Sequence, residues 1–266
     1  DDGFITRFDG NRWHRIESGV DADLNAVWGW SGDEVYVGGD EGVLLRFGGE
    51  SWNWIDCDAY TDITDIWGVG HANVFICGSV GKVYHYKDDQ LIEQSVLPWL
   101  TYYGIWANSE NMALCIGSDN IISHFDGEDW DQITEFNNIG LKAVWGSSEN
   151  DVFAVGENGK ILHYDGGQWT SMESGTSENL WDVWGLSGNN VIAVGENGTI
   201  LHYDGNTWLA MNSDVETNLY GIWGAANDKI YAVGDNCTIL NYDGTTWNNI
   251  PIDPALRFGG LCGIWG

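Results

Sequence analysis

Short apolar segments alternate with turns rich in Gly, Asn and Asp along the whole chain. The clearest stretch reads Leu-Lys-Ala-Val-Trp-Gly at 141–146, Asp-Val-Phe-Ala-Val-Gly at 151–156, Lys-Ile-Leu-His-Tyr at 160–164 and Gln-Trp-Thr-Ser-Met at 168–172. Each segment is rich in β-branched and aromatic residues, which favours strands. Glu-Asn-Gly and Asp-Gly-Gly, which separate the last three segments, supply the positive-φ residues of hairpin turns. The stretch predicts a small sheet of four antiparallel strands.

The same pattern recurs every 39 residues, except that the last spacing is 42. The first predicted strand of each copy contains Trp-Gly, or Trp-Ala once, and these Trp residues are Trp28, Trp67, Trp106, Trp145, Trp184, Trp223 and Trp265. An aromatic column keeps the same register at Phe8, Phe47, Tyr86, Phe125, Tyr164, Tyr203 and Tyr242. A sheet this small cannot bury both of its apolar faces alone, so the copies must stack face to face. A closed ring of sheets arranged radially around one axis achieves this. The sequence therefore predicts an all-β fold, a β-propeller in a single domain over residues 1–266.

The two ends of the chain match parts of one further unit. Residues 3–16 resemble the third and fourth strands of a unit, and residues 261–266 resemble a first strand. With six full units between them, we expect a seven-bladed propeller of four-stranded antiparallel blades, whose shared seventh blade lacks its second strand. An open strand edge is usually covered. The chain would continue beyond residue 1 or 266, another molecule would donate a strand, or the blade would close with three strands.

The repeat resembles a known group of propellers. Val-Trp-Gly, Asp-Val-Phe-Ala-Val-Gly-Glu-Asn-Gly and Ile-Leu-His-Tyr-Asp-Gly followed by Trp resemble the Trp-rich repeats of secreted or surface bacterial β-propeller proteins. They are also similar to the photosystem II assembly-factor and BNR (Asp-box) propellers. The resemblance covers essentially the whole chain and implies the propeller fold, but no particular activity.

The net charge of the chain limits the classes of molecule that it can bind. Lys plus Arg number 10 and Asp plus Glu number 40, for a formal charge of −30. Such a surface repels phosphate backbones and anionic lipid, so we expect no nucleic-acid partner. No apolar run approaches the roughly 20 residues of a membrane helix, so we expect no membrane insertion. The acidity fits an extracellular or periplasmic location at the cell surface.

One position at the start of the first strands varies while the scaffold stays constant. Three residues before each of the seven Trp residues, the chain has Asn25, Thr64, Tyr103, Lys142, Trp181, Tyr220 and Cys262. Packing favours similar residues at equivalent places, so this variability indicates a ligand surface at the mouth of one propeller face, although loop support is the alternative. Flat aromatic faces suit sugar rings or peptide side chains. We therefore predict a non-enzymatic recognition module that binds carbohydrate or protein ligands through the first six of these residues.

Two other functions remain open. Asp65 and Asp182 lie three units apart, nearly opposite each other across the channel, and their carboxyls would be roughly 6–10 Å apart, which overlaps the separation in inverting glycosidases. A glycoside hydrolase or lyase is thus one alternative, unless each Asp caps a neighbouring backbone amide. The other alternative is a structural subunit of an extracellular assembly, in which a partner subunit or another copy donates a strand to the incomplete blade.

We expect no bound cofactor. His85, His124, His163 and His202 recur at one strand position, about 15 Å apart in neighbouring units, and so cannot share a metal ion. The carboxylates of Asp56, Asp58 and Asp62 are the type of ligand that Ca²⁺ takes, although their spacing is not that of an EF-hand loop.

The five Cys residues leave at least one thiol unpaired within the chain. Cys77 and Cys115 replace small apolar residues of the second strand, so we expect them to be buried. Cys237 and Cys262 lie in adjacent units and are the candidate disulfide, for which sequence supplies no distance.

Overall fold

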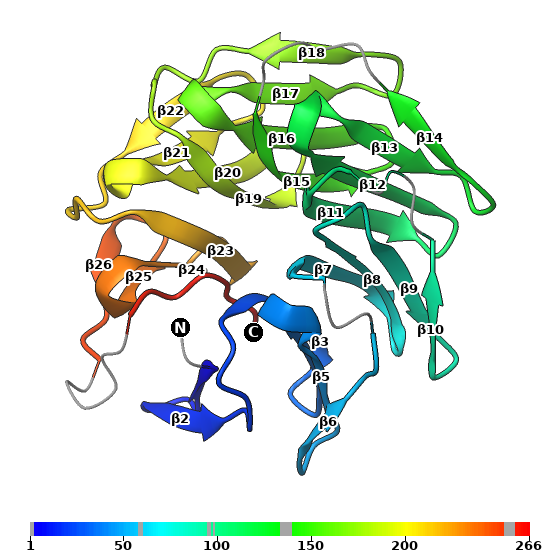
Figure 1. Ribbon diagram of the computed structural model, residues 1–266. Coiled ribbons are helices and arrows are strands. Elements are labelled where there is room, and N and C mark those ends of the chain that lie inside the picture. Colours follow the sequence, from blue (N-terminus) through cyan, green and yellow to red (C-terminus); the bar gives the residue numbers. More distant parts are fainter. Residues whose placement is uncertain (1–2, 58–60, 95–96, 98, 134–139, 253–258) are drawn as a thin grey trace.

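The computed structural model describes residues 3–57, 61–94, 97, 99–133, 140–252 and 259–266. These residues form 26 strands, arranged as six four-stranded antiparallel sheets and one two-stranded sheet. The sheets follow one another around a ring in chain order (Figure 1). The prediction of an all-β propeller with four-stranded antiparallel blades is confirmed. In the described part of the chain, no helix has the length and apolarity needed to cross a membrane.

Each blade contains four consecutive strands, and the first strands of neighbouring blades contact one another around the channel. Blade 1 contains β3 (Leu24–Ser31), β4 (Glu34–Gly39), β5 (Leu44–Phe47) and β6 (Trp52–Trp54). Blade 2 contains β7 (Ile63–Gly70), β8 (Asn73–Gly78), β9 (Val83–Lys87) and β10 (Gln90–Glu93). Blade 3 contains β11 (Tyr102–Ser109), β12 (Met112–Gly117), β13 (Ile122–Phe125) and β14 (Trp130–Ile133). Blade 4 contains β15 (Leu141–Ser148), β16 (Asp151–Gly156), β17 (Ile161–Tyr164) and β18 (Trp169–Met172). Blade 5 contains β19 (Leu180–Ser187), β20 (Asn190–Gly195), β21 (Ile200–Tyr203) and β22 (Trp208–Met211). Blade 6 contains β23 (Leu219–Ala226), β24 (Lys229–Gly234), β25 (Thr238–Tyr242) and β26 (Trp247–Asn249).

The core runs through the second strands. In β16, all four residues from Val152 to Val155 are fully buried, because neighbouring blades cover both faces of the sheet; this explains their continuous apolar sequence. A short 3₁₀ turn, η3 (Glu157–Gly159), follows β16, with Asn158 and Gly159 at φ 55° and 69°. In the next hairpin, Asp165 Oδ1 accepts the N–H groups of Gly167 and Gln168, both at 2.9 Å. The Asp-Gly pairs therefore build the turns that the sequence predicts.

The Trp-Gly motif is a contact between blades. The Trp145 indole of blade 4 packs on Gly185 of blade 5, where an added Cβ would lie 2.7 Å from Trp145 Cη2. Trp106 packs on Gly146 in the same way. Glycine allows the indole to reach the backbone of the next blade directly. In the one copy with Trp-Ala, the Trp67 indole N–H donates a hydrogen bond to the Ala107 carbonyl at 3.0 Å.

The expectation of a seventh blade, formed by an N-terminal strand pair and a C-terminal first strand, is wrong, because the described residues form six four-stranded blades and one two-stranded sheet. The seventh position holds a hairpin of β1 (Phe4–Phe8) and β2 (Trp13–Glu17). Residues 261–266, expected as a first strand, have no strand assignment. The physical reason is that the described residues supply no second strand at this position, since a first strand in this fold hydrogen-bonds within its blade only to the second.

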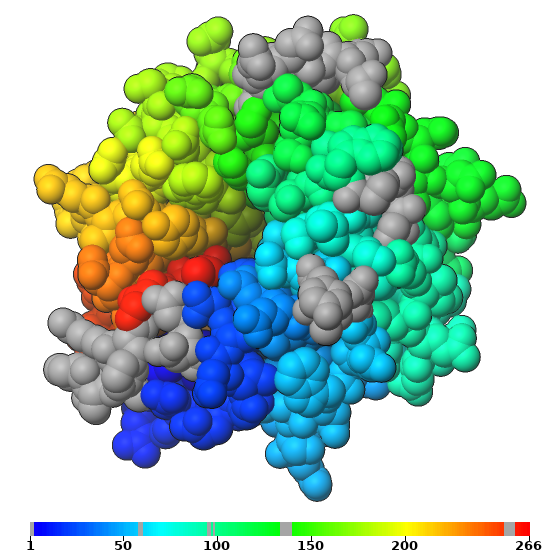
Figure 2. Space-filling model, viewed as in Figure 1, coloured from blue at the N-terminus to red at the C-terminus, as the bar shows by residue number. Residues whose placement is uncertain are grey.

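The C-terminal segment nevertheless lies between blades 6 and 1. The Leu261 N–H donates to the Gly234 carbonyl at 3.1 Å, and the Trp265 indole packs on Gly29 of blade 1 as Trp145 packs on Gly185. Figure 2 shows this red segment and the dark blue N-terminal hairpin between orange blade 6 and the lighter blue of blade 1.

Candidate functional site

Four of the six predicted mouth residues form a continuous row across blades 3 to 6. The Lys142 ammonium lies 4.5 Å from the ring centroid of Tyr103 and 5.7 Å from that of Trp181. The rings of Trp181 and Tyr220 follow, with centroids 6.2 Å apart and planes at 55°. All four side chains are half-buried. We call Tyr103, Lys142, Trp181 and Tyr220 the aromatic arc.

A backbone irregularity positions these side chains. In β15, Leu141 pairs with Gly156 and Ala143 with Val155, so Lys142 is the additional residue of a β-bulge. The same register shift occurs at Tyr103, Trp181 and Tyr220. A bulge redirects a side chain relative to the regular pleat. In these four strands the variable position is therefore a residue that the ladder leaves unpaired, and a second shift near the end of each strand leaves another, such as Ser147 in β15.

Acidic turn residues hold two members of the arc. Lys142 Nζ forms an ion pair with Glu157 Oε1 at 3.0 Å. The Tyr220 hydroxyl donates to Asp235 Oδ2 at 3.3 Å, and burial raises the pKa of Tyr220. Sequence analysis did not single out these two anchoring contacts. The sequence does contain a signal for these two contacts. Each acidic residue follows its partner by 15 positions and lies at the start of the turn after the second strand.

The Trp181 indole N–H is buried and has no hydrogen-bond partner in the described residues. A buried donor without an acceptor costs roughly 1–3 kcal/mol. Lys142 and Tyr220 have polar partners, whereas Trp181 carries a buried donor without one among the described residues.

The remaining two mouth residues do not join the arc. Asn25 Nδ2 donates to Asp40 Oδ1 at 2.8 Å and to the Ile63 carbonyl of blade 2 at 3.1 Å. Thr64 Oγ1 donates to the Tyr102 carbonyl of blade 3 at 2.7 Å. Because these polar groups already connect neighbouring blades, both side chains support the scaffold.

Asp65 and Asp182 also connect blades. The two carboxylate oxygens of Asp65 accept the N–H groups of Ile66 and Ile105, each at 2.8 Å. Asp182 accepts those of Val183 and Ile222 at the same distance. Burial raises the pKa of each carboxyl to about 7, against the opposing effect of these hydrogen bonds. With both oxygens of each carboxylate bound to backbone amides, the geometry favours capping over acid–base catalysis.

No cluster of three or more His, Cys, Asp or Glu side chains suited to a metal ion occurs in the described part of the chain. Of the proposed calcium ligands, Asp58 lies outside the described residues, and Asp62 Oδ1 accepts the Glu41 N–H at 3.1 Å. The Ca²⁺ expectation stays a prediction. Three of the recurring His residues contact an Asn or Asp of their own blade, as in the 2.7 Å contact of His163 Nε2 with Asp151 Oδ1.

Within the described residues, no disulfide joins any two of the five cysteines. Cys77 and Cys115 are fully buried, as predicted. Cys237 is buried and Cys262 is exposed, and the candidate disulfide between them is not formed.

Comparison with known proteins shows the fold. The chain matches no known protein-family model and no curated protein. A solved structure of YCF48 bound to D1 peptide matches with a TM-score of 0.74 and 19% identity, over 91% of this chain and 86% of that one. YCF48 from Cyanidioschyzon merolae matches with a TM-score of 0.68 and 14% identity, over 90% and 87%. The WD40 propeller domain of Doa1 matches with a TM-score of 0.69 and 13% identity, over 97% and 89%. The resemblance to assembly-factor propellers is thus confirmed at the level of fold.

Proposed function

We propose that the protein is a non-enzymatic recognition module that binds a peptide segment of a partner protein at the aromatic arc. The observation that carries this proposal is the unbroken contact from Tyr103 through Lys142 and Trp181 to Tyr220. These residues differ from blade to blade on a scaffold that otherwise repeats. Tyr and Trp are also the residues that contribute most often to interface hot spots.

The chemistry of the arc indicates what the ligand presents. Its rings offer flat apolar faces, while Lys142 supplies a positive charge in a protein of net charge −30. The buried Trp181 N–H has no acceptor among the described residues, and a peptide carbonyl or carboxylate that displaced the atoms covering the indole edge would provide one. An apolar ligand side chain would then cover the neighbouring rings.

Fold likeness supports a peptide as ligand. YCF48, a propeller of similar architecture, has been solved with D1 peptide bound. Carbohydrate is the second candidate, because sugar rings also stack on flat aromatic faces. We further propose an extracellular or periplasmic setting at the cell surface, which the acidic composition supports.

The test selects peptides on the wild-type protein from a random 12-residue library and measures their affinities by calorimetry. Trp181→Ala should weaken binding of the selected peptides at least about tenfold, because it removes the central ring and the free indole donor. Tyr220→Ala should act in the same direction.

Trp30→Ala is the matched control, since Trp30 is 57% exposed on β3 and lies outside the arc. It should leave binding unchanged. Peptides that bind Trp181→Ala as tightly as wild type would remove the arc as the site. A parallel glycan array, with binding that depends on Trp181, would assign the arc to carbohydrate instead.

A further inference from the structure

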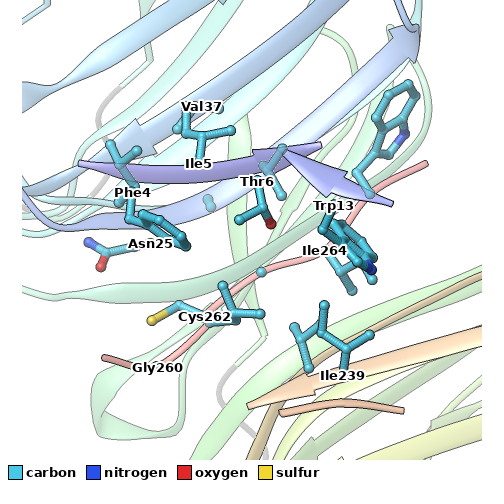
Figure 3. Close-up of a pocket in the computed structure, with 17 residues that line it drawn as sticks. Phe4, Ile5, Thr6, Trp13, Asn25, Val37, Ile239, Gly260, Cys262 and Ile264 are labelled. Atoms are coloured by element: carbon cyan, nitrogen blue, oxygen red, sulfur yellow. The ribbon is translucent and has the colours of Figure 1, made fainter. Parts of the chain in front are cut away.

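Two pockets lie between complete blades, at equivalent places in the repeat. One has a volume of about 360 Å³ and lies between blades 5 and 6, with Ile192, His202 and Tyr242 in its lining. We call it the blade 5–6 pocket. The other, of about 200 Å³, lies two repeats earlier between blades 3 and 4, with Leu114 in place of Ile192. Figure 3 shows a third pocket, of about 110 Å³, which lies against β1 and the C-terminal segment instead. The first two can be compared directly with the same place in other blades.

In blades 2 and 4, an aromatic ring from the third residue of the second strand fills this place. The ring centroid of Phe153 lies 4.4 Å from that of His163 on the adjacent strand. It lies 5.3 Å from that of Tyr203 in the next blade. The ring of Phe75 stacks on His85 in the same way, with centroids 4.1 Å apart.

Blade 5 has Ile192 in place of the ring. Ile192 pairs across the sheet with His202, as Phe153 pairs with His163. An aliphatic side chain ends short of the place that the outer part of a phenyl ring reaches, and the blade 5–6 pocket lies there.

The exposure of the facing aromatic residue supports this comparison. Between complete blades, where the third residue is aromatic, the ring that it contacts in the next blade is buried: Tyr86, Phe125 and Tyr203 are 6%, 3% and 8% exposed. Where the third residue is Leu or Ile, the corresponding Tyr164 and Tyr242 are half-buried. Both pockets therefore follow from one change of residue type.

His202 provides a fixed flat surface in the blade 5–6 pocket. Its Nε2 lies 2.8 Å from Asn190 Oδ1, and the Asn190 amide donates to Asn227 Oδ1 of blade 6 at 2.7 Å. Burial lowers the pKa of His202, which favours the neutral imidazole at pH 7. A planar ring could stack on this imidazole as Phe153 stacks on its own.

The charge of the lining indicates the sign of the ligand. Asp204 and Asp228 line the pocket, and none of its described lining residues is Lys or Arg. Asp204 Oδ1 accepts the N–H groups of Thr207 and Asn206, both at 2.9 Å, and these bonds hold the pKa of its carboxyl below the ordinary value. Asp228 is exposed. Two carboxylates in a chain of net charge −30 favour a positively charged ligand.

Size distinguishes the two pockets. Small-molecule sites usually have volumes of about 300–1,000 Å³, and an apolar cavity of about 150 Å³ is enough to hold benzene. The blade 5–6 pocket falls within the usual range, whereas the pocket between blades 3 and 4 falls below it.

We propose that the blade 5–6 pocket binds a small aromatic amine, in which a planar ring carries a positively charged amino group. The ring would lie against His202 and Tyr242, where the outer part of the Phe153 ring lies one blade earlier. The ammonium group would lie towards Asp204 and Asp228.

This site is separate from the aromatic arc and goes beyond the function proposed there. Trp181 lies near the start of β19, whereas Asn189 and Asn190 of the pocket follow the end of that strand. Eight extended residues separate the two levels by more than about 20 Å.

The test titrates the protein with 2-phenylethylamine and follows the backbone amides by two-dimensional NMR. We expect saturable one-to-one binding in the millimolar range or tighter, with shifts at Ile192 and Tyr242. The alcohol 2-phenylethanol keeps the ring without the charge, and 2-cyclohexylethylamine keeps the charge without the flat ring. Each should bind at least about fivefold more weakly.

Ile192→Phe places in blade 5 the residue that blades 2 and 4 carry. It should weaken 2-phenylethylamine binding at least about tenfold, because the protein's own ring then occupies the site. An unchanged amide spectrum away from the pocket shows that the variant is folded. Leu114→Phe, the same kind of substitution between blades 3 and 4, is the matched control and should leave the affinity unchanged. Asp228→Asn should weaken binding of the amine about threefold more than binding of 2-phenylethanol.

Trp181→Ala should leave amine binding unchanged, so failure of the arc and failure of the pocket can be told apart. Absence of saturable binding would overturn the proposal, as would binding that persists in Ile192→Phe or is lost in Leu114→Phe. Equal affinities for the three compounds would also overturn it, because the pocket would then recognise neither the ring nor the charge.

Discussion

Replacement of Trp145 by Ala should lower the free energy of unfolding by about 3–5 kcal/mol, the range for a large buried aromatic side chain. Trp145 is 6% exposed and packs on Gly185 of blade 5. Its removal would leave a cavity between two rigid sheets that cannot collapse readily. Urea unfolding, analysed by linear extrapolation, measures the change.

The control for this experiment is Trp30→Ala. Trp30 lies at the end of β3 and is 57% exposed, so its loss should change the unfolding free energy by less than about 0.5 kcal/mol. Equal destabilisation by the two substitutions would contradict the assignment of the Trp-Gly motif to interblade packing.

The partner of Trp145 offers an independent check. An added Cβ at Gly185 would lie 2.7 Å from Trp145 Cη2 and 2.9 Å from the Asn190 carbonyl oxygen, so Gly185→Ala should also destabilise the protein. In the double variant, the truncated residue 145 makes room for the methyl group. The sum of the two single-variant losses in unfolding free energy should therefore exceed the loss measured for the double variant. A double-mutant cycle measures this coupling. Strict additivity would show that the two residues do not interact.

The repeat made most of the fold predictable. A Trp-Gly pair every 39 residues has one physical meaning in stacked sheets, namely an indole against a bare backbone, and Trp145 and Gly185 show it. Asp165 before Gly166 likewise predicts its hairpin, because the carboxylate accepts the amides of that turn. Such signals are local or recur in register, so they can be read without coordinates.

The seventh blade could not be predicted in the same way. Residues 261–266 have the residue types of a first strand, and Trp265 occupies the corresponding interblade position. A strand in a sheet also needs a neighbouring strand to hydrogen-bond with. A match of residue types at the repeat positions does not show whether such a neighbour is present. The segment therefore packs as a first strand would, but it makes only the Leu261–Gly234 hydrogen bond to β24 and has no strand assignment.

The mouth was predicted in part for a similar reason. Variability at one position identified Lys142 and Trp181, which do meet in the arc. It also identified Asn25 and Thr64, whose polar groups bind carbonyls of the next blade. The difference depends on contacts across blades some 38 residues away, which the sequence does not display. The same holds for Asp65, where only the structure distinguishes a cap from a catalytic group.

The burial of Asp65 leads to a pH dependence of stability with a definite sign. Burial raises the pKa of its carboxyl from an ordinary 3.8 to about 7 in the folded state. Between these pH values the folded protein binds more protons at Asp65 than the unfolded chain does. The contribution of this group to stability is therefore full below about pH 4, falls as pH rises to 7, and is constant above that. A shift of this size corresponds to roughly 4 kcal/mol.

His85 acts in the opposite direction, because burial lowers its pKa to about 4. The folded state excludes a proton that the unfolded chain binds, so stability is lost as pH falls from 6.5 towards 4. A pH profile of the wild type alone would mix the two effects. They separate in the difference between wild type and Asp65→Asn, because His85 is present in both proteins.

In that difference, the advantage of wild type over Asp65→Asn should shrink by roughly 3–4 kcal/mol between pH 4 and pH 8. Asn does not ionise, and its single oxygen can accept from only one of the Ile66 and Ile105 amides, which adds a constant cost at every pH. Urea unfolding at unit steps of pH gives the profile, and carboxyl NMR of Asp65 gives the pKa directly. Asp131→Asn, which removes an exposed carboxylate from β14, controls for the loss of one negative charge. Parallel profiles for wild type and Asp65→Asn would mean that burial between blades 2 and 3 does not raise the pKa of this carboxyl, and the pH dependence argued from that burial would then fail.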